Sequence, residues 1–409
     1  MQGRYFVRCG DGSLISFYHV QNKGVLYRIN LRGKWQPEKL LLENGQRNFS
    51  VCFEKNKILV FCQDNNGNVM LYQGNGDNWR GRVILNNQSD KVHRILFSPI
   101  ISETAGKAGL CLVYNMPAAE GDGHYLVKQH LSEGKWDRPE RLDKVTRLNN
   151  ELYNIQYISH DHCVLFYQTK SAEYKLGYRE VASAAHGAFH LIHSSAYQVT
   201  GHSFLVTDSE IHVLYIIRNM FGSQLLYKKK NNTDFSAPLV IFEGQRIENC
   251  LLSIINDNIY IHFQSAGQMY QCISDDKGES FSRPRRYRHK ICESPVKAVY
   301  LSEAAQKENQ FFCREVYVDE NNSWDVQILP DLYEDFYLPL PEVKQAVSPS
   351  PAAVPGPSHE QAPPREQNKE PDEAFWLKTK LSVLENQVRE RDDRIRQLTA
   401  MLEAEKERS

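Results

Sequence analysis

The chain lacks any long hydrophobic run. No segment contains the roughly 18 consecutive apolar residues of a membrane-spanning helix, so no membrane association is expected. The first residues also lack the basic and then apolar pattern of a signal peptide, so we expect a cytoplasmic protein. The net charge is −1, with 24% charged residues. No global field draws the chain onto nucleic acid, which is therefore not expected as a partner.

The cysteines lack the close pairing of a metal site. There are nine, none as C-x-x-C, and most lie inside apolar runs. Free, buried thiols are the simplest interpretation. The segment from His160 to Cys163 offers the one cluster of ligand types, but it lies between two apolar runs, where a turn is expected. We therefore expect no metal.

The fingerprints of common catalytic sites are missing as well. The chain contains no G-x-S-x-G, H-E-x-x-H, Walker or dinucleotide-binding sequence. We therefore expect no catalytic residue and no cofactor.

What the chain does contain is a repeat. Each unit has an apolar pair with a tyrosine, then a polar turn, an aromatic residue and another short apolar strand. The unit recurs seven times, and subtraction places successive tyrosines 43 to 53 residues apart. The anchors are Tyr27 to Trp35, Tyr72 to Trp79, Tyr125 to Trp136, Tyr178 to Phe189, Tyr227 to Phe235, Tyr270 to Phe281 and Tyr317 to Trp324.

One period holds four short apolar runs. In the second unit they cover 49–53, 58–62, 69–72 and 83–85, separated by Asn- and Gly-rich turns. Four antiparallel strands per period of this length are typical of a propeller blade. We therefore predict an all-β fold, a seven-bladed β-propeller. The seventh unit is one strand short unless an end of the chain completes the ring, for which the amino-terminal segment is the candidate, so six or eight blades stay open.

The aromatic residue at the turn before each outer strand has a structural interpretation. A blade cannot bury both faces alone, so neighbouring blades must stack. We expect Trp35, Trp79 and Trp136 to wedge between blades rather than to stack on a ligand.

One unit carries a sharper motif, in which Ser274, Asp276, Gly278 and Phe281 fit S-x-D-x-G-x-x-[FW]. This motif resembles the Asp-box, or BNR repeat, of sialidase-like β-propellers. The resemblance covers about residues 1 to 332, with the full motif once. It implies a hairpin turn in which the aspartate accepts from local amides, the glycine takes a positive φ and the aromatic ring packs below.

The resemblance to sialidase-like propellers also suggests a chemistry to look for. Such hydrolases need three arginines for the substrate carboxylate, a tyrosine nucleophile with its glutamate, and an acid/base aspartate. The nearest match to their first arginine motif is the segment 4–8, which lacks the proline and the spacing. An enzyme is thus not expected; if the chain is one, it is a sialidase-like glycoside hydrolase.

A dense basic run covers residues 283–290, with three further lysines at 228–230. Such a run binds phosphates of nucleic acid or anionic lipid. We favour a solvated outer strand whose charges keep an exposed edge from pairing with other chains.

The composition changes after the repeats. Nine of the chain's 17 prolines lie between Pro339 and Pro371, which indicates a disordered spacer. We divide the chain into a propeller (1–335), a proline-rich linker (336–371) and a coiled-coil helix (372–409).

The final segment has a heptad pattern. The a positions are Leu381, Val388, Ile395 and Leu402, and the d positions are Leu377, Leu384, Arg391 and Leu398. This pattern predicts a parallel homodimer, with packing against the chain's own propeller as the alternative.

Together these features favour a non-catalytic binding or scaffold protein, whose propeller recognises a protein partner and whose tail oligomerises. The alternative is a carbohydrate-active propeller, either a sialidase-like glycosidase or a lectin. Two heads on one coiled coil would gain avidity for a repeated ligand.

Overall fold

The structure is a computed structural model. It describes residues 4–31, 34–54, 57–76, 78–87, 95–104, 107–118, 123–132, 135–148, 151–159, 161–183, 185–207, 210–231, 234–287, 295–302, 311–319 and 337–338. Contact clustering separates a unit Met1–Val343 from Lys344–Ser409. The linker apart from Tyr337–Leu338, the eight heptad positions and Trp324 lie outside the described residues, so the predictions that concern them stay predictions.

The described strands form six sheets in chain order. The first blade contains β1 (Arg4–Arg8), β2 (Leu14–Val20), β3 (Gly24–Leu31), β4 (Lys34–Trp35) and β5 (Lys39–Glu43). The second contains β6 (Ser50–Glu54), β7 (Lys57–Gln63), β8 (Val69–Gly74) and β9 (Trp79–Leu85). The third contains β10 (Phe97–Thr104), β11 (Lys107–Pro117), β12 (His124–Ser132), β13 (Lys135–Trp136) and β14 (Glu140–Val145).

The remaining three blades repeat this antiparallel order. The fourth contains β15 (Tyr153–Tyr157), β16 (His162–Lys170), β17 (Tyr174–Ala182) and β18 (His190–Ser195). The fifth contains β19 (Val199–Val206), β20 (Glu210–Asn219), β21 (Gly222–Asn231), β22 (Asp234–Phe235) and β23 (Leu239–Gly244). The sixth contains β24 (Ile247–Ile255), β25 (Asn258–Ser265), β26 (Gln268–Ser274) and β27 (Arg285–Tyr287), to which β31 (Tyr337–Leu338) adds.

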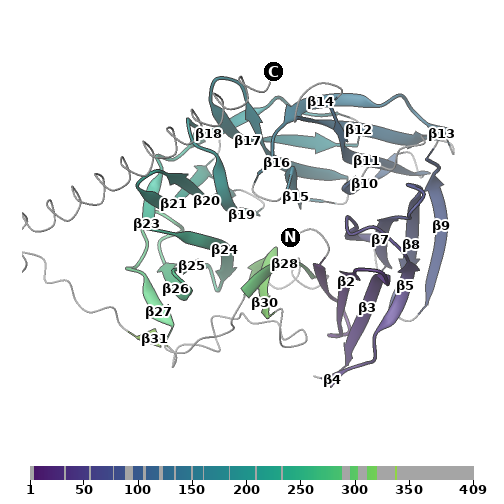
Figure 1. Ribbon diagram of the computed structural model, residues 1–409, viewed down its shortest axis with the longest axis horizontal. Coiled ribbons are helices and arrows are strands. Elements are labelled where there is room, and N and C mark those ends of the chain that lie inside the picture. Colours follow the sequence, from purple (N-terminus) through teal and green to yellow (C-terminus); the bar gives the residue numbers. More distant parts are fainter. Residues whose placement is uncertain are drawn as a thin grey trace, which may run out of the picture. The chain divides into compact units, whose positions relative to one another are not determined.

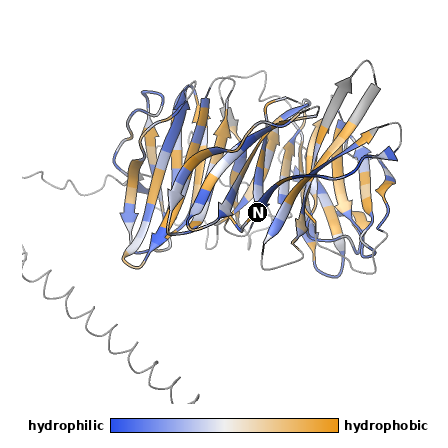
Figure 2. Cartoon of the chain, turned by 90° about the horizontal axis from the view of Figure 1, so that it is seen from above, coloured by the Kyte–Doolittle hydropathy of each residue, from blue (hydrophilic) through white to orange (hydrophobic). Residues whose placement is uncertain are grey.

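Each blade packs against the next one along the chain. Separate hydrophobic clusters join blades one and two, two and three, three and four, four and five, and five and six. The second strand of a blade has a neighbouring blade against each of its faces. This is why β16 and β20 are apolar and buried over most of their length. Figure 2 shows these hydrophobic stretches running along the strands. This serial stacking of antiparallel blades is a β-propeller arrangement (Figure 1).

Three further strands join the last blade to the first. They are β28 (Pro295–Ser302), β29 (Phe311–Cys313) and β30 (Glu315–Asp319). β29 pairs with β24 of the sixth blade, β30 pairs with β28, and β28 runs parallel to β1. The expected part of the amino-terminal segment in closing the ring is therefore confirmed. Much of the seventh repeat unit lies outside the described residues, so the count of seven blades stays a prediction.

The aromatic residues at the turns lie between blades, as expected. Trp79 packs edge-on against Phe17 and Tyr27 of the first blade, with ring centroids 5.5 and 5.6 Å away. Trp136 Nε1 donates to the Ile84 carbonyl of the second blade at 2.7 Å. Trp35 packs with the cluster that joins β1 to the closing strands. These rings are part of the blade contacts, so they are structural.

The described cysteines are free thiols, and seven of these eight are buried, which confirms the sequence-based interpretation for them. Among the described residues, no helix has the length and hydrophobicity needed to cross a membrane.

Candidate functional site

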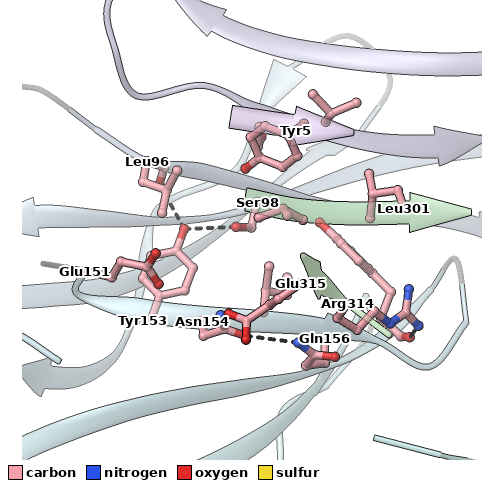
Figure 3. A pocket seen from close by; sticks show the side chains of 15 residues that line it. Tyr5, Leu96, Ser98, Glu151, Tyr153, Asn154, Gln156, Leu301, Arg314 and Glu315 are labelled. Carbon is pink, nitrogen blue, oxygen red and sulfur yellow. Dashed lines mark hydrogen bonds between the residues drawn. The ribbon is translucent and has the colours of Figure 1, made fainter. Parts of the chain in front are cut away.

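A cavity lies among the first strands of the blades and the closing strands (Figure 3). Its volume is about 70 Å³. It is lined by Tyr5, Ser50, Val51, Leu96, Ser98, Glu151, Tyr153, Asn154, Ile155, Gln156, Tyr157, Val299, Leu301, Arg314 and Glu315. The lining comes from four blades and from β28 and β30, so the cavity exists only once the ring has closed.

Tyr153 holds two walls of this cavity together. Its hydroxyl donates to the Leu96 carbonyl at 2.9 Å, and the Val113 carbonyl lies 3.1 Å away. Ser98 Oγ also lies 3.1 Å from this hydroxyl. Tyr153 is fully buried, and its burial raises the pKa of the phenol. The hydroxyl therefore connects the third and fourth blades and does not take part as an ionised group.

A buried ion pair lies in the part of the cavity wall that the closing strands form. Lys297 Nζ lies 3.1 Å from Glu315 Oε2, and Ser203 Oγ donates to the same carboxylate at 2.5 Å. Lys297 also donates to the His202 carbonyl. These contacts fasten β28 and β30 to β19 of the fifth blade. Arg314 donates to the Tyr157 carbonyl at 2.8 Å and so connects the closing strands to the fourth blade.

Glu151 is the second carboxylate of the cavity. Backbone hydrogen bonds in both directions with Leu148 fix the turn that carries it. Its Oε2 lies 3.7 Å from His202 Nε2, which is ion-pair range but longer than a hydrogen bond. Burial raises the pKa of Glu151, but His202 and the charge of Lys297 oppose this and hold it at about 2. The side chain is therefore an ionised acceptor at neutral pH.

Two buried side-chain oxygen atoms of the lining have no hydrogen-bond partner in the described part of the chain. They are Ser50 Oγ and Gln156 Oε1, on residues that are 5% and 3% exposed. Gln156 Nε2 is bonded to Asn154 Oδ1 at 3.2 Å, so only the oxygen of this amide is left. Polar groups buried in this way cost free energy unless a ligand or water binds them.

The four residues that fit the S-x-D-x-G-x-x-[FW] pattern lie elsewhere, at the turn after β26. Ser274 Oγ donates to Asp276 Oδ1 at 2.7 Å and accepts from the Gly278 amide at 2.7 Å. The amide and hydroxyl of Ser280 both donate to Asp276, at 2.9 and 2.6 Å. Gly278 has a φ of 87°, and Phe281 packs edge-on against Tyr227 of the fifth blade. The turn brings the four motif residues together away from the cavity lining.

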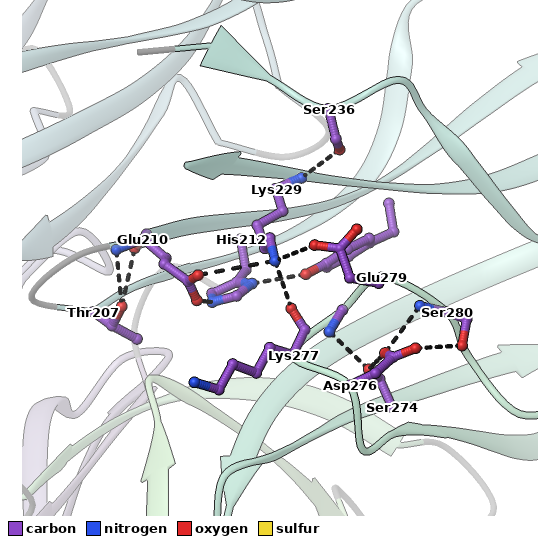
Figure 4. A network of polar contacts seen from close by, with 12 residues as sticks. Thr207, Glu210, His212, Lys229, Ser236, Ser274, Asp276, Lys277, Glu279 and Ser280 are labelled. Carbon is purple, nitrogen blue, oxygen red and sulfur yellow. Dashed lines mark hydrogen bonds and ion pairs between the residues drawn. The ribbon is translucent and has the colours of Figure 1, made fainter. Parts of the chain in front are cut away.

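A polar network fastens this turn to the fifth blade (Figure 4). Lys229 Nζ donates to the Lys277 carbonyl at 2.9 Å and to Glu279 Oε1 at 2.7 Å. His212 Nδ1 lies 2.7 Å from the Tyr227 hydroxyl, and its Nε2 lies 3.3 Å from Glu210 Oε2. The contacts join two blades, so this network is a structural one.

Sequence reasoning missed the cavity. Its polar residues belong to separate segments: Ser50 begins β6, and Asn154 and Gln156 alternate with apolar residues in β15. Such positions were the one signal available, because a buried polar residue in a strand needs a partner.

Comparison with known proteins gives only distant likenesses. No family model and no curated protein matches the chain. A fungal lectin from Aleuria aurantia, described as a six-bladed β-propeller that recognises fucose, has a TM-score of 0.40 at 12% identity, over 69% of this chain and 94% of the lectin. AofleA from Arthrobotrys oligospora has a TM-score of 0.38 at 9% identity, over 68% and 85%. A thermostable family-43 glycoside hydrolase has a TM-score of 0.36 at 12% identity, over 60% and 94%.

At these scores the likeness carries no argument about a ligand. The propeller arrangement therefore rests on the strand pairing and on the packing between blades.

Proposed function

We propose that the chain is a carbohydrate-binding propeller, whose cavity binds one neutral monosaccharide unit without hydrolysing it. The size of the cavity supports a small group of a ligand. Its volume of about 70 Å³ is about half that of an engineered cavity that binds benzene. It therefore suits one hydroxyl-bearing edge of a sugar ring, whereas a segment of a protein partner needs far more space. Carbohydrate binding thus has better support than the scaffold interpretation of the sequence.

The polar groups of the lining suit a sugar. Each sugar hydroxyl donates and accepts, so it needs carboxylate, amide or hydroxyl oxygens together with N–H groups. Glu151, Asn154, Gln156 and Arg314 provide both kinds around one space. The rings of Tyr5 and Tyr157 add apolar surface, against which the C–H face of a sugar packs.

The observation that carries the proposal is the pair of unpartnered atoms, Ser50 Oγ and Gln156 Oε1. They come from the second and fourth blades and line the same cavity. A ligand hydroxyl that bonded to both atoms would remove the cost of burying them.

The charges of the site favour a neutral ligand. In the described lining, Glu151 and Glu315 are the carboxylates and Arg314 is the one arginine. Lys297 is paired with Glu315. The three arginines that a sialidase uses to hold a carboxylate sugar are therefore not assembled in this lining.

The same groups argue for binding rather than hydrolysis. A glycosidase needs one carboxylic acid that keeps its proton near neutral pH. The pKa of Glu151 is held at about 2, well below that requirement.

The heptad residues of the tail give the proposal a second part. A parallel dimer through 372–409 would present two sugar-binding heads. Weak single sites would then combine into avid binding to a surface with repeated sugars.

The test is saturation-transfer NMR on the full chain with methyl glycosides of neutral hexoses, deoxyhexoses and N-acetylhexosamines, and with N-acetylneuraminic acid. We expect transfer to at least one neutral glycoside, with none to the acid. The variant Gln156→Leu should lose this transfer, and Asp276→Asn, in the distant turn, should keep it. Absence of transfer to every neutral glycoside, or unchanged transfer in Gln156→Leu, would overturn the proposal.

A further inference from the structure

His202 occupies a fixed position beside the cavity. It lies on β19, the first strand of the fifth blade, and is 3% exposed. Its ring stacks on Phe204 with centroids 4.9 Å apart, and Phe204 stacks on Phe166 of the fourth blade at 4.1 Å. The imidazole is thus held in one plane by aromatic neighbours.

The polar atoms of this ring are not satisfied by the protein. In the described part of the chain, neither Nδ1 nor Nε2 of His202 has a hydrogen-bond partner. Burying such groups without partners costs about 1–3 kcal/mol each. A phenylalanine would fill the same aromatic stack without this cost. The fold therefore tolerates a polar ring that its packing does not require.

A charged residue of the cavity lining lies close to this ring. His202 Nε2 lies 3.7 Å from Oε2 of Glu151, which lines the cavity. Lys297 donates to the carbonyl of His202, and Lys297 is itself held by Glu315. The backbone at His202 is therefore fixed, while the gap between the imidazole and the Glu151 carboxylate is slightly too long for a hydrogen bond.

We infer that His202 is a positioning residue for Glu151, and that its Nε2–H closes onto the carboxylate when a sugar hydroxyl binds there. This inference rests on the proposed sugar binding. Hydrogen bonds at binding sites are often long without ligand and shorten in the complex. A donor on Oε2 would orient the carboxylate, so that its other oxygen accepts from the sugar. His202 would then determine affinity without touching the ligand.

Two substitutions separate positioning from packing. His202→Phe keeps the stack on Phe204 but removes the donor, and His202→Gln keeps a donor without the ring. We expect His202→Phe to bind the glycoside about tenfold or more weakly, since a hydrogen bond to a charged group is lost. His202→Gln should recover much of the affinity.

The direct readout is nitrogen NMR of the full chain labelled with ¹⁵N-histidine, with the His202 signals assigned by their absence from His202→Gln. Adding the neutral glycoside that binds should shift the Nε2 signal. In His202→Phe, equal affinity for the glycoside would overturn the inference, as would a His202 signal that does not move on binding. If the unmodified chain binds no neutral glycoside, the proposed function itself is wrong. A failure of the inference about His202 can therefore be distinguished from a failure of the proposed function.

Discussion

The turn of the sixth blade and the central cavity are both rich in polar side chains, but these side chains differ in how many hydrogen-bond partners they have. In the turn, Lys229, Ser274 and Asp276 each have several partners. In the cavity, Ser50 and Gln156 keep buried oxygen atoms without a partner in the described part of the chain. The first pattern is what stability requires, and the second costs stability. The difference separates the polar groups that hold this turn from the two cavity oxygens to which we propose that a ligand binds.

The largest expected effect comes from the one part of the cavity that is fully paired. Glu315→Ala would leave Lys297 buried beside its missing partner, in a site where the two side chains are 3% and 9% exposed. Removing one member of a buried pair costs about 3–5 kcal/mol. Urea unfolding of the full chain should show this loss.

The matched control replaces both partners. Glu315→Met with Lys297→Met should recover most of the stability, because no uncompensated charge is left. If the double variant is as unstable as Glu315→Ala, the pair matters through its shape and not through its charge.

The next effect concerns the network beside the turn and depends on pH. Burial lowers the pKa of His212 to about 4, and the charge of Lys229 acts in the same direction. Between an unfolded value near 6.5 and this value, the folded state binds fewer protons than the unfolded state. The free energy of unfolding should therefore fall as the pH falls through this window, by about 3 kcal/mol.

His212→Asn tests this pH dependence, since it keeps a polar group near Tyr227 but does not titrate. Its unfolding free energy, measured by urea at pH 7 and pH 4, should vary less than that of the unmodified chain. His190→Asn, at an exposed position, should retain the full dependence. If the unfolding free energy of His212→Asn depends on pH as strongly as that of the unmodified chain, other groups cause the acid sensitivity.

Much of the turn could be predicted because its interactions are local. Ser274, Asp276 and Gly278 act within five residues, so their spacing in the sequence already describes the hairpin. The blades were predictable for a similar reason, since four strands recur in every period. The strands observed in the second blade overlap all four predicted runs.

The cavity could not be predicted because it depends on distant pairings, although the amino-terminal segment was the candidate for closing the ring. Tyr5 lies opposite Val299 through the parallel pairing of β1 with β28. Glu151 belongs to the fourth blade and Arg314 to the closing strands, and no spacing in the sequence brings them together. Asn154 and Gln156, two polar residues in one short strand, were the trace that a site left in the sequence.

A smaller effect should follow from crowding the turn. Gly278 has a φ of 87°, and a Cβ there would lie 2.2 Å from the Tyr227 hydroxyl. We expect Gly278→Ala to cost about 3 kcal/mol, from backbone strain and from displacement of Tyr227. Gly267 has a φ of 72° with no atom within 4 Å of a Cβ, so Gly267→Ala isolates the backbone cost, about 1 kcal/mol. If the thermal midpoint falls equally in the two variants, Tyr227 moves aside without a measurable cost.

The smallest expected effect distinguishes the two regions most directly, because the same substitution is made in both. Ser50 and Ser274 are 5% and 1% exposed, so each loses a buried hydroxyl on conversion to alanine. Ser274→Ala should cost about 1–2 kcal/mol, since Asp276 and the Gly278 amide lose their partner. Ser50→Ala should change the free energy of unfolding by less than about 1 kcal/mol, and toward stability, because its hydroxyl has no partner in the described structure. If Ser50→Ala instead loses as much as Ser274→Ala, the Ser50 hydroxyl is already bound in the free protein. The cavity would then be as fully paired as the turn, and the proposed ligand would have to displace a tightly held water.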